Sequence, residues 1–122
     1  MKYFDFLIIG SNGLLGSHLV KTLKEKKIKF LTIARSGSDC NLDLKNYKNL
    51  NSFFLKNKFK IVINCVAKID INFCEVKFNE AKLINFKFVE YLSKMANKFN
   101  FKLVQISTDH VYKGKKFCLN NE

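Results

Sequence analysis

The segment FDFLIIGSNGLLG, residues 4–16, decides the fold of this chain of 122 residues. Its first part is a short, nearly continuous apolar run, which is typical of a strand buried on both faces of a parallel sheet. Gly10, Gly13 and Gly16 follow and lead into a helical pattern. A tight turn brings backbone N–H groups against a pyrophosphate only where no Cβ intervenes, and a helix N-terminus adds partial positive charge. The segment therefore predicts strand, glycine turn and helix at a dinucleotide phosphate.

Strand and helix patterns alternate through the rest of the chain. After the turn, a mainly apolar set of residues recurs at helical spacing: Leu14, Leu15, His18, Leu19, Thr22 and Leu23. Further strands are predicted at residues 30–34, 61–66 and 102–106, a weaker helix at 44–55 and a long helix at 78–99. This alternation predicts an α/β fold of the Rossmann type, a doubly wound, three-layer structure around a parallel sheet. Counting the four predicted strands along the chain, we expect the order 3-2-1-4, in one domain over residues 1–122.

The charge of the chain says little about its partners. The formal net charge is +12, with lysines spread from Lys2 to Lys116 and Arg35 as the only arginine. Bidentate recognition of phosphate and guanine usually relies on arginine, so scattered lysines argue against a dedicated nucleic-acid site. No specific nucleic-acid partner is expected.

The cysteines and the N-terminal run bear on other classes of protein. Cys40, Cys65, Cys74 and Cys118 form no C-x-x-C pair and have no histidine at ligand spacing, so we expect buried, reduced thiols and no metal site. The apolar run over residues 3–9 is too short to span a membrane and lacks a cleavage site. We expect a cytoplasmic protein with no membrane partner.

The end of the second predicted strand bears on the choice of cofactor. In a dinucleotide-binding unit an acid at this point bonds the adenosine ribose 2′-hydroxyl, whereas an arginine suits a 2′-phosphate. Arg35 stands there, which favours NADP. Asp39 is close enough to act as the missing acid if the loop folds back, and this alternative leaves NAD open.

Four separated segments resemble one family in order and spacing. They are IIGSNGLLG (residues 8–16), NCVAKIDINFCE (64–75), AKLIN (81–85) and ISTDHVYKG (106–114). On these motifs the chain resembles the extended short-chain dehydrogenases of the dTDP-4-dehydrorhamnose reductase type. The resemblance implies reduction of the 4-keto group of a nucleotide-linked deoxysugar with a nicotinamide cofactor. A nucleotide sugar is thus the implied substrate of the full-length form.

The resemblance also implies roles for individual residues. It assigns the pyrophosphate cradle to Gly10, Asn12, Gly13, Leu14, Leu15 and Gly16. It makes Arg35 the 2′-phosphate contact, lets Asp43 and Leu44 touch the adenine, and lines the cofactor with Cys65, Val66 and Ala67. Thr108 would hydrogen-bond the substrate carbonyl, which gains negative charge as hydride arrives, and Asn85 would support the proton relay. His110 and Lys68 stand where the family usually has aromatic residues.

The proton donor of this superfamily is a tyrosine followed four residues later by a lysine on the same helical face. Tyr112 and Lys116 have that spacing, but Gly114 between them disfavours the required helix. We therefore expect a truncated chain that holds the cofactor half and is inactive alone. Two alternatives stay open: a cofactor-binding regulatory module without catalysis, and a fragment of an NAD-dependent nucleotide-sugar epimerase or dehydratase. Association as a homodimer is also left open.

Overall fold

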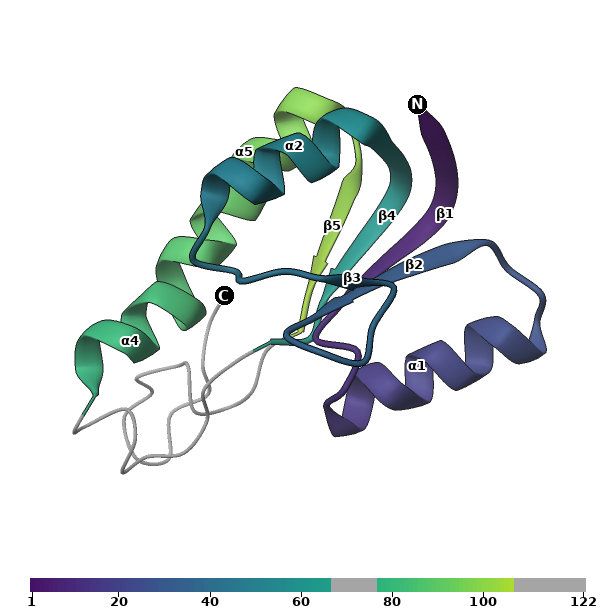
Figure 1. The fold of residues 1–122 in the computed structure, drawn as a ribbon, viewed down its shortest axis with the longest axis horizontal. Helices are drawn as coiled ribbons and strands as arrows, with labels where there is room; N and C mark the ends of the chain where they lie inside the picture. Colours follow the sequence, from purple (N-terminus) through teal and green to yellow (C-terminus); the bar gives the residue numbers. More distant parts are fainter. Residues whose placement is uncertain (67–76, 107–122) are drawn as a thin grey trace, which may run out of the picture.

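Strands and helices alternate along the chain as the apolar patterns predict. The computed structural model of the protein describes residues 1–66 and 77–106 (Figure 1). In chain order the elements are β1 (Lys2–Ile9), α1 (Leu14–Glu25), β2 (Phe30–Ala34), β3 (Cys40–Asn41), α2 (Tyr47–Lys56), β4 (Asn57–Asn64), α4 (Phe78–Lys82), the π-helical segment η1 (Leu83–Lys87), α5 (Phe88–Phe99) and β5 (Lys102–Gln105). The sequence patterns missed β3, which lies inside the expected polar loop, and the π-helical turn within the long helix.

The sheet is parallel, with the strand order β3-β2-β1-β4-β5. β1 is central, and its Leu7 pairs with Leu31 of β2 on one side and with Val62 of β4 on the other. The expected order 3-2-1-4 is wrong for the strands it counted, because it placed residues 61–66 beside β2. The short β3 occupies that place, and the chain then crosses over β1 through α2 and adds β4 on the far side.

The helices form a layer on each face of the sheet. α1 covers one face, while α2, α4 and α5 lie on the other (Figure 1), and this confirms the doubly wound, three-layer architecture. Because both faces are covered, the successive residues Leu7, Ile8 and Ile9 are all fully buried, as the continuous apolar run predicts. The main buried cluster comprises Leu7, Ile9, Ile33, Leu50, Phe53, Phe54, Phe59, Val62, Phe88, Tyr91, Leu92 and Phe101.

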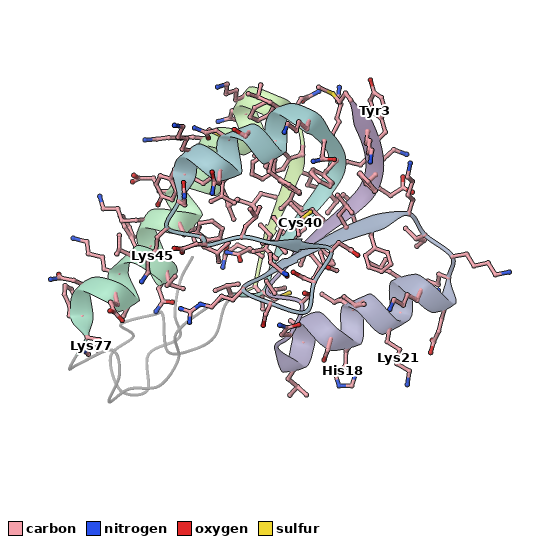
Figure 2. All side chains as sticks on the ribbon, viewed as in Figure 1. Tyr3, His18, Lys21, Cys40, Lys45 and Lys77 are labelled. Atoms are coloured by element: carbon pink, nitrogen blue, oxygen red, sulfur yellow. The ribbon has the colours of Figure 1, made fainter. Side chains whose placement is uncertain are left out.

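Helix α1 buries a narrower stripe than the sequence pattern predicts. Gly16 and Leu23 are buried and Leu19 is half-buried, which is one row at helical spacing. Four positions that were expected in the core are instead exposed: Leu14, Leu15, His18 and Thr22. Figure 2 shows His18 and Lys21 pointing away from the sheet. The helix approaches the sheet through its glycine, so only the row that contains Gly16 faces the strands.

Side chains and left-handed residues determine where several helices begin and end. The Asn46 side chain accepts the Asn49 N–H at 3.1 Å and caps the start of α2. α1 is followed by Lys27 and α5 by Asn100, each with φ of 56°. After each left-handed residue, the next N–H returns to a carbonyl of the last turn, at 3.0 Å from Ile28 to Leu23 and 3.2 Å from Phe101 to Ala96. These turns deliver the chain directly into β2 and β5.

A pair of tyrosines joins the two helices on one face of the sheet. The rings of Tyr47 in α2 and Tyr91 in α5 stack with their centroids 4.3 Å apart. The Tyr91 hydroxyl donates to Asn51 Oδ1 at 2.7 Å. Burial, and secondarily the neighbouring Tyr47, raises the pKa of Tyr91 to about 12. The neutral phenol is therefore the form that this helix contact stabilises.

The described residues contain neither a membrane-spanning helix nor a cluster of metal ligands. None of the helices in residues 1–66 and 77–106 has the length and apolar character needed to cross a bilayer. Within those same residues, histidines, cysteines and carboxylates do not come together in groups of three or more that could hold a metal ion.

The tyrosine pair makes protein stability depend on pH at the alkaline end. An unfolded tyrosine ionises near pH 10, whereas Tyr91 in the folded protein ionises near pH 12. Its stabilising contribution is therefore complete below about pH 10 and is lost as pH rises towards 12. We expect Tyr91→Phe to lower the free energy of unfolding by about 0.5–1.5 kcal/mol at neutral pH, through loss of the bond to Asn51.

Urea unfolding followed by circular dichroism at several pH values measures both effects. The native protein should lose stability more steeply than Tyr91→Phe as the pH is raised through this range. Tyr3→Phe is the matched control, because Tyr3 is exposed. Equal pH dependence in native protein and Tyr91→Phe would contradict the assignment.

Candidate functional site

The glycine turn between β1 and α1 is held by two close backbone approaches. Gly10 has φ of +84°, and a Cβ there would lie 2.6 Å from Val66 Cγ2. A Cβ on Gly16 would run into the carbonyl oxygen of Gly10 and stand 2.9 Å from its carbonyl carbon. Both positions therefore require glycine, as predicted. Gly13 differs, because a Cβ there would make an ordinary contact of 3.6 Å with the Gly10 oxygen, so the packing within the protein does not itself require glycine at this position.

Hydrogen bonds tie this turn to the ends of the neighbouring strands. The Gly10 N–H donates to the Ile33 carbonyl at 2.9 Å, and the Cys65 N–H donates to the Ile9 carbonyl at 2.8 Å. The Asn12 side-chain amide donates to the Ser36 carbonyl at 2.6 Å and so holds the loop after β2 against the turn. The carboxyl ends of three strands thus meet at the glycines, where open α/β sheets bind ligands.

The start of α1 is left open for an anion. Gly13 is the N-cap residue and offers no side chain to accept from the first N–H groups, and the first turn contains no acidic residue. These N–H groups and the helix dipole therefore favour a negative ligand at this end. In the same turn the hydroxyl oxygen of Ser11 is buried, and it has no hydrogen-bond partner within the described residues. Open N–H donors and bare glycine backbone together fit the pyrophosphate of a dinucleotide.

A cleft of about 240 Å³ opens beside the turn. It brings together most of the residues predicted to bind the cofactor, from four separate segments: Gly10, Asn12, Gly13, Arg35, Asp43, Leu44 and Val66. Sequence reasoning assigned no role there to four other lining residues: Ile33, Ala34, Lys45 and Ile84. Ile33 and Ala34 are the last residues of β2, and Lys45 follows Leu44, so adjacency to predicted residues was the available signal. Nothing in the sequence pattern indicated Ile84.

Other predicted cofactor residues lie around this cleft without lining it. The side chains of Leu14 and Leu15 are exposed on α1. Their contribution to the site would therefore come from their backbone N–H groups at the helix start. Gly16 acts through the close packing described above. Cys65 is half-buried, and burial raises the pKa of its thiol, which keeps it protonated and unreactive. The expected fully buried thiols are thus half-buried at both described positions, Cys40 and Cys65.

Arg35 and Asp39, the two residues considered for the ribose position, lie in different surroundings. Arg35 is exposed, lines the cleft and has no ion pair with any described carboxylate. The loop does fold back, but the Asp39 carboxylate accepts the Thr32 N–H at 3.0 Å and the Thr32 hydroxyl at 3.1 Å. In return, the Asp39 N–H donates to Thr32 Oγ1 at 2.9 Å. Asp39 is therefore held against β2 through its Oδ2, and it does not line the cleft.

The loop before α2 forms another wall of the cleft. The Asp43 side chain accepts the Lys45 N–H at 2.9 Å, and its carbonyl accepts the Asn46 N–H at 3.0 Å. This local turn presents Leu44 to the cleft between a carboxylate and an ammonium group. An apolar side chain flanked by polar groups suits a flat, polar-edged ring such as adenine.

A buried side-chain amide, to which sequence reasoning assigned no role, joins the ends of β4 and β5 below the turn. Asn64 is fully buried at the end of β4. Its Oδ1 accepts the Val66 N–H at 3.1 Å, and its Nδ2 donates to Gln105 Oε1 at 2.8 Å. Asn64 thereby fixes Val66, whose methyl group packs on Gly10, and it links β4 to the end of β5.

The predicted catalytic positions are only partly described. Asn85 is half-buried in η1, next to Ile84 of the cleft, and π-helical turns are frequent at functional sites. Thr108 and Ala67 lie outside the described residues, as do His110, Lys68, Tyr112 and Lys116. Their predicted roles stay predictions.

Comparison with known proteins agrees with this geometry. The sequence model of the family described as the RmlD substrate binding domain matches residues 4–119. The chain is 30% identical over 110 residues to a dTDP-4-dehydrorhamnose reductase of Aggregatibacter actinomycetemcomitans, covering 90% of this chain and 36% of that protein. The chain therefore spans about a third of this relative's length.

Two solved structures have the same fold. A dTDP-4-dehydrorhamnose reductase from Bacillus anthracis, solved in complex with NADP, superposes with a TM-score of 0.80 at 26% identity, over 96% of this chain and 40% of that one. MoeE5 in complex with UDP-glucose and NAD superposes with a TM-score of 0.77 at 21% identity, over 91% of this chain and 38% of that one. At that identity the second likeness shows the fold alone.

The unequal roles of the glycines lead to a stability prediction. Gly16→Ala forces a Cβ into the Gly10 peptide, so we expect it to lower the free energy of unfolding by about 1–3 kcal/mol. Gly13→Ala is the matched control, and it should cost less than half as much because its Cβ meets no close atom. Denaturant unfolding of both variants measures the difference. Equal destabilisation by the two substitutions would contradict the geometry of the turn.

Proposed function

Since this chain belongs to the RmlD substrate binding domain family, we propose that it is the cofactor-binding part of an NADP-dependent reductase of a nucleotide-linked 4-keto-deoxysugar. One observation carries the proposal. The cleft beside the open start of α1 is lined by the glycine turn, by Arg35 at the end of β2 and by the Asp43–Leu44 wall. These are groups suited to a pyrophosphate, a 2′-phosphate and an adenine, and they are brought together at one cleft.

The case for NADP over NAD depends on charge. A phosphate monoester carries about −1.5 to −2 charges at neutral pH, and arginine binds it through two parallel hydrogen bonds. Arg35 is available for this, because no described carboxylate pairs with it. Recognition of an unphosphorylated ribose needs an acid at the same place, and Asp39 already accepts two hydrogen bonds from Thr32. Among the described residues that line the cleft, Asp43 alone carries a carboxylate, and its side chain accepts the Lys45 N–H at 2.9 Å.

The reductase chemistry would divide between cofactor and protein. The bound nicotinamide supplies the hydride. The start of α1 and Arg35 would hold the two phosphate regions, and Thr108 would donate to the ketone oxygen of the substrate. Asn85, in the helix that borders the cleft, would support the proton relay. The resemblance places the tyrosine and lysine of the relay, and the substrate region, further along the chain, and this chain spans 36% of the Aggregatibacter relative.

The cofactor assignment is tested by binding to the chain itself. We expect NADPH to bind at least about 10-fold more tightly than NADH in a fluorescence titration, because hydrogen bonds between charged groups contribute about 1.5–3 kcal/mol. Arg35→Ala should erase this preference by weakening NADPH alone. Lys48→Ala, which removes an exposed cation outside the cleft, is the matched control and should leave the preference intact. Equal affinity of the native chain for the two cofactors would favour the NAD-dependent branch instead.

The catalytic assignment is tested in a chimera that joins this chain to the remaining part of the Aggregatibacter relative. The 122-residue chain alone should not reduce dTDP-4-dehydrorhamnose, and the chimera should. In the chimera, Thr108→Ala should lower kcat by roughly 100-fold with little change in KM, because a donor to a developing oxyanion acts mainly in the transition state. Ser107→Ala is the matched control. A chimera that binds NADPH normally but is inactive would favour a non-catalytic module.

A further inference from the structure

Lysines gather at the edge of the sheet where the strands begin, opposite the cofactor cleft. They look scattered in the sequence, but helix ends and strand starts of a parallel α/β fold meet at this edge. Ten of the 17 lysines in the described residues lie there: Lys2, Lys24, Lys26, Lys27, Lys29, Lys56, Lys58, Lys60, Lys98 and Lys102. Two carboxylates, Asp5 and Glu25, accompany them in the same segments. The edge is therefore strongly basic.

The helix dipole explains only part of this cluster. Lys24, Lys56 and Lys98 occupy the last turns of α1, α2 and α5, where a positive charge is favourable. The lysines at the strand starts have no such role. The Asp5 N–H donates to the Lys29 carbonyl at 2.9 Å, and the Asp5 carboxylate pairs with Lys60. Lys29 and Lys60 therefore lie on either side of β1 at Asp5.

These strand-start lysines border a cleft of about 390 Å³ that has aromatic walls. Its lining residues are Tyr3, Phe4, Asp5, Lys29, Lys58, Phe59, Lys60 and Asn100. The rings of Phe4 and Phe59 stack at 5.7 Å and form the apolar floor. Tyr3 is 63% exposed and projects from the start of β1 (Figure 2). Its ring is thus available to a ligand, beside Lys58, with which it pairs in register.

The charges of this cleft are only partly balanced. Lys60 Nζ lies 3.1 Å from Asp5 Oδ1, and Lys29 Nζ lies 4.9 Å from the centre of the Phe4 ring. Neither Lys29 nor Lys58 has a carboxylate partner within the described residues. The cleft therefore presents two ammonium groups without a carboxylate partner in the described residues and one paired ammonium group, and the exposed ring of Tyr3 lines the same cleft.

We propose that this basic aromatic cleft binds single-stranded nucleic acid without sequence preference. Lys29, Lys58 and Lys60 contact backbone phosphates, and Tyr3 stacks on a base. A positively charged groove with an exposed ring is the combination that such ligands need, since every base offers a flat face. An acidic polypeptide would use the lysines but gain little from the ring. The cleft is separate from the cofactor site, so the proposal does not rest on the proposed function.

The test uses the whole chain and a fluorescently labelled oligothymidylate of about twelve nucleotides, followed by anisotropy at several salt concentrations. With three phosphate contacts, the logarithm of the association constant should fall with the logarithm of salt with a slope of about −2. Replacing Lys29, Lys58 and Lys60 together by Gln should weaken binding by about 10-fold or more and flatten this slope. Tyr3→Ala should weaken it by about 5-fold or more at unchanged slope.

Two matched variants make the test specific. Lys21→Gln, Lys48→Gln and Lys94→Gln together remove the same charge from other surfaces and should change affinity by less than about 3-fold. Asp5→Asn removes the one carboxylate among the described residues that line the cleft, and it should tighten binding. Thermal unfolding and NADPH titration of each variant show that the fold and the cofactor cleft are unchanged.

The outcomes separate the possible ligands. Equal weakening by the two triple variants would show attraction by overall charge and overturn the proposal. Binding of polyglutamate as tight as that of the oligonucleotide, or insensitivity to Tyr3→Ala, would overturn it in favour of an acidic polypeptide surface. Absence of any oligonucleotide binding at low salt would overturn it as well, whatever the result with NADPH.

Discussion

The contact between the backbones of Gly10 and Gly16 is the constraint on which the site depends. Because neither residue has a Cβ, the first turn of α1 presses directly against the end of β1. That contact directs the open N–H groups of the helix into the space above the strand ends, and it leaves room for Val66 to pack on the turn. Asn12 then holds the loop after β2 against the same turn. Three segments that a dinucleotide would touch are thus arranged around this one backbone contact: the start of α1, the chain at Val66 and the loop after β2.

Sheet topology explains why a cleft forms at this point and not elsewhere along the strand ends. The chain adds β2 and β3 on one side of β1 and β4 and β5 on the other, so its connections diverge above β1. Divergence leaves a crevice at the switch point, the general place for ligands in open α/β sheets. The residues that line the cleft come from both sides of this switch point. Arg35 and Leu44 lie on either side of β3, and Val66 and Ile84 follow β4.

Much of this could be predicted from sequence because it depends on local backbone chemistry. The glycine spacing, the buried run before it and the position of Arg35 are each sequence patterns with one dominant structural solution. The place of β4 beside β1 could not be obtained in this way, since it followed from a two-residue strand that has no pattern of its own. The same holds for Ile84, which reaches the cleft through a π-helical turn, and for the pairing of Asp39 with Thr32, which depends on how the loop closes.

The pairing of Asp39 with Thr32 has a consequence for how these molecules behave towards one another. β3 covers only the end of β2, at Ile33 and Ala34, so the N–H of Thr32 would otherwise face outward on an open strand. An uncovered strand edge is a template on which a second chain can add its own strand, and this is a common route to aggregation. Here a side-chain carboxylate occupies the donor that an incoming strand would use, and it places a negative charge in that strand's path. The loop that follows β2 therefore also hinders the addition of a foreign strand at this position of the sheet.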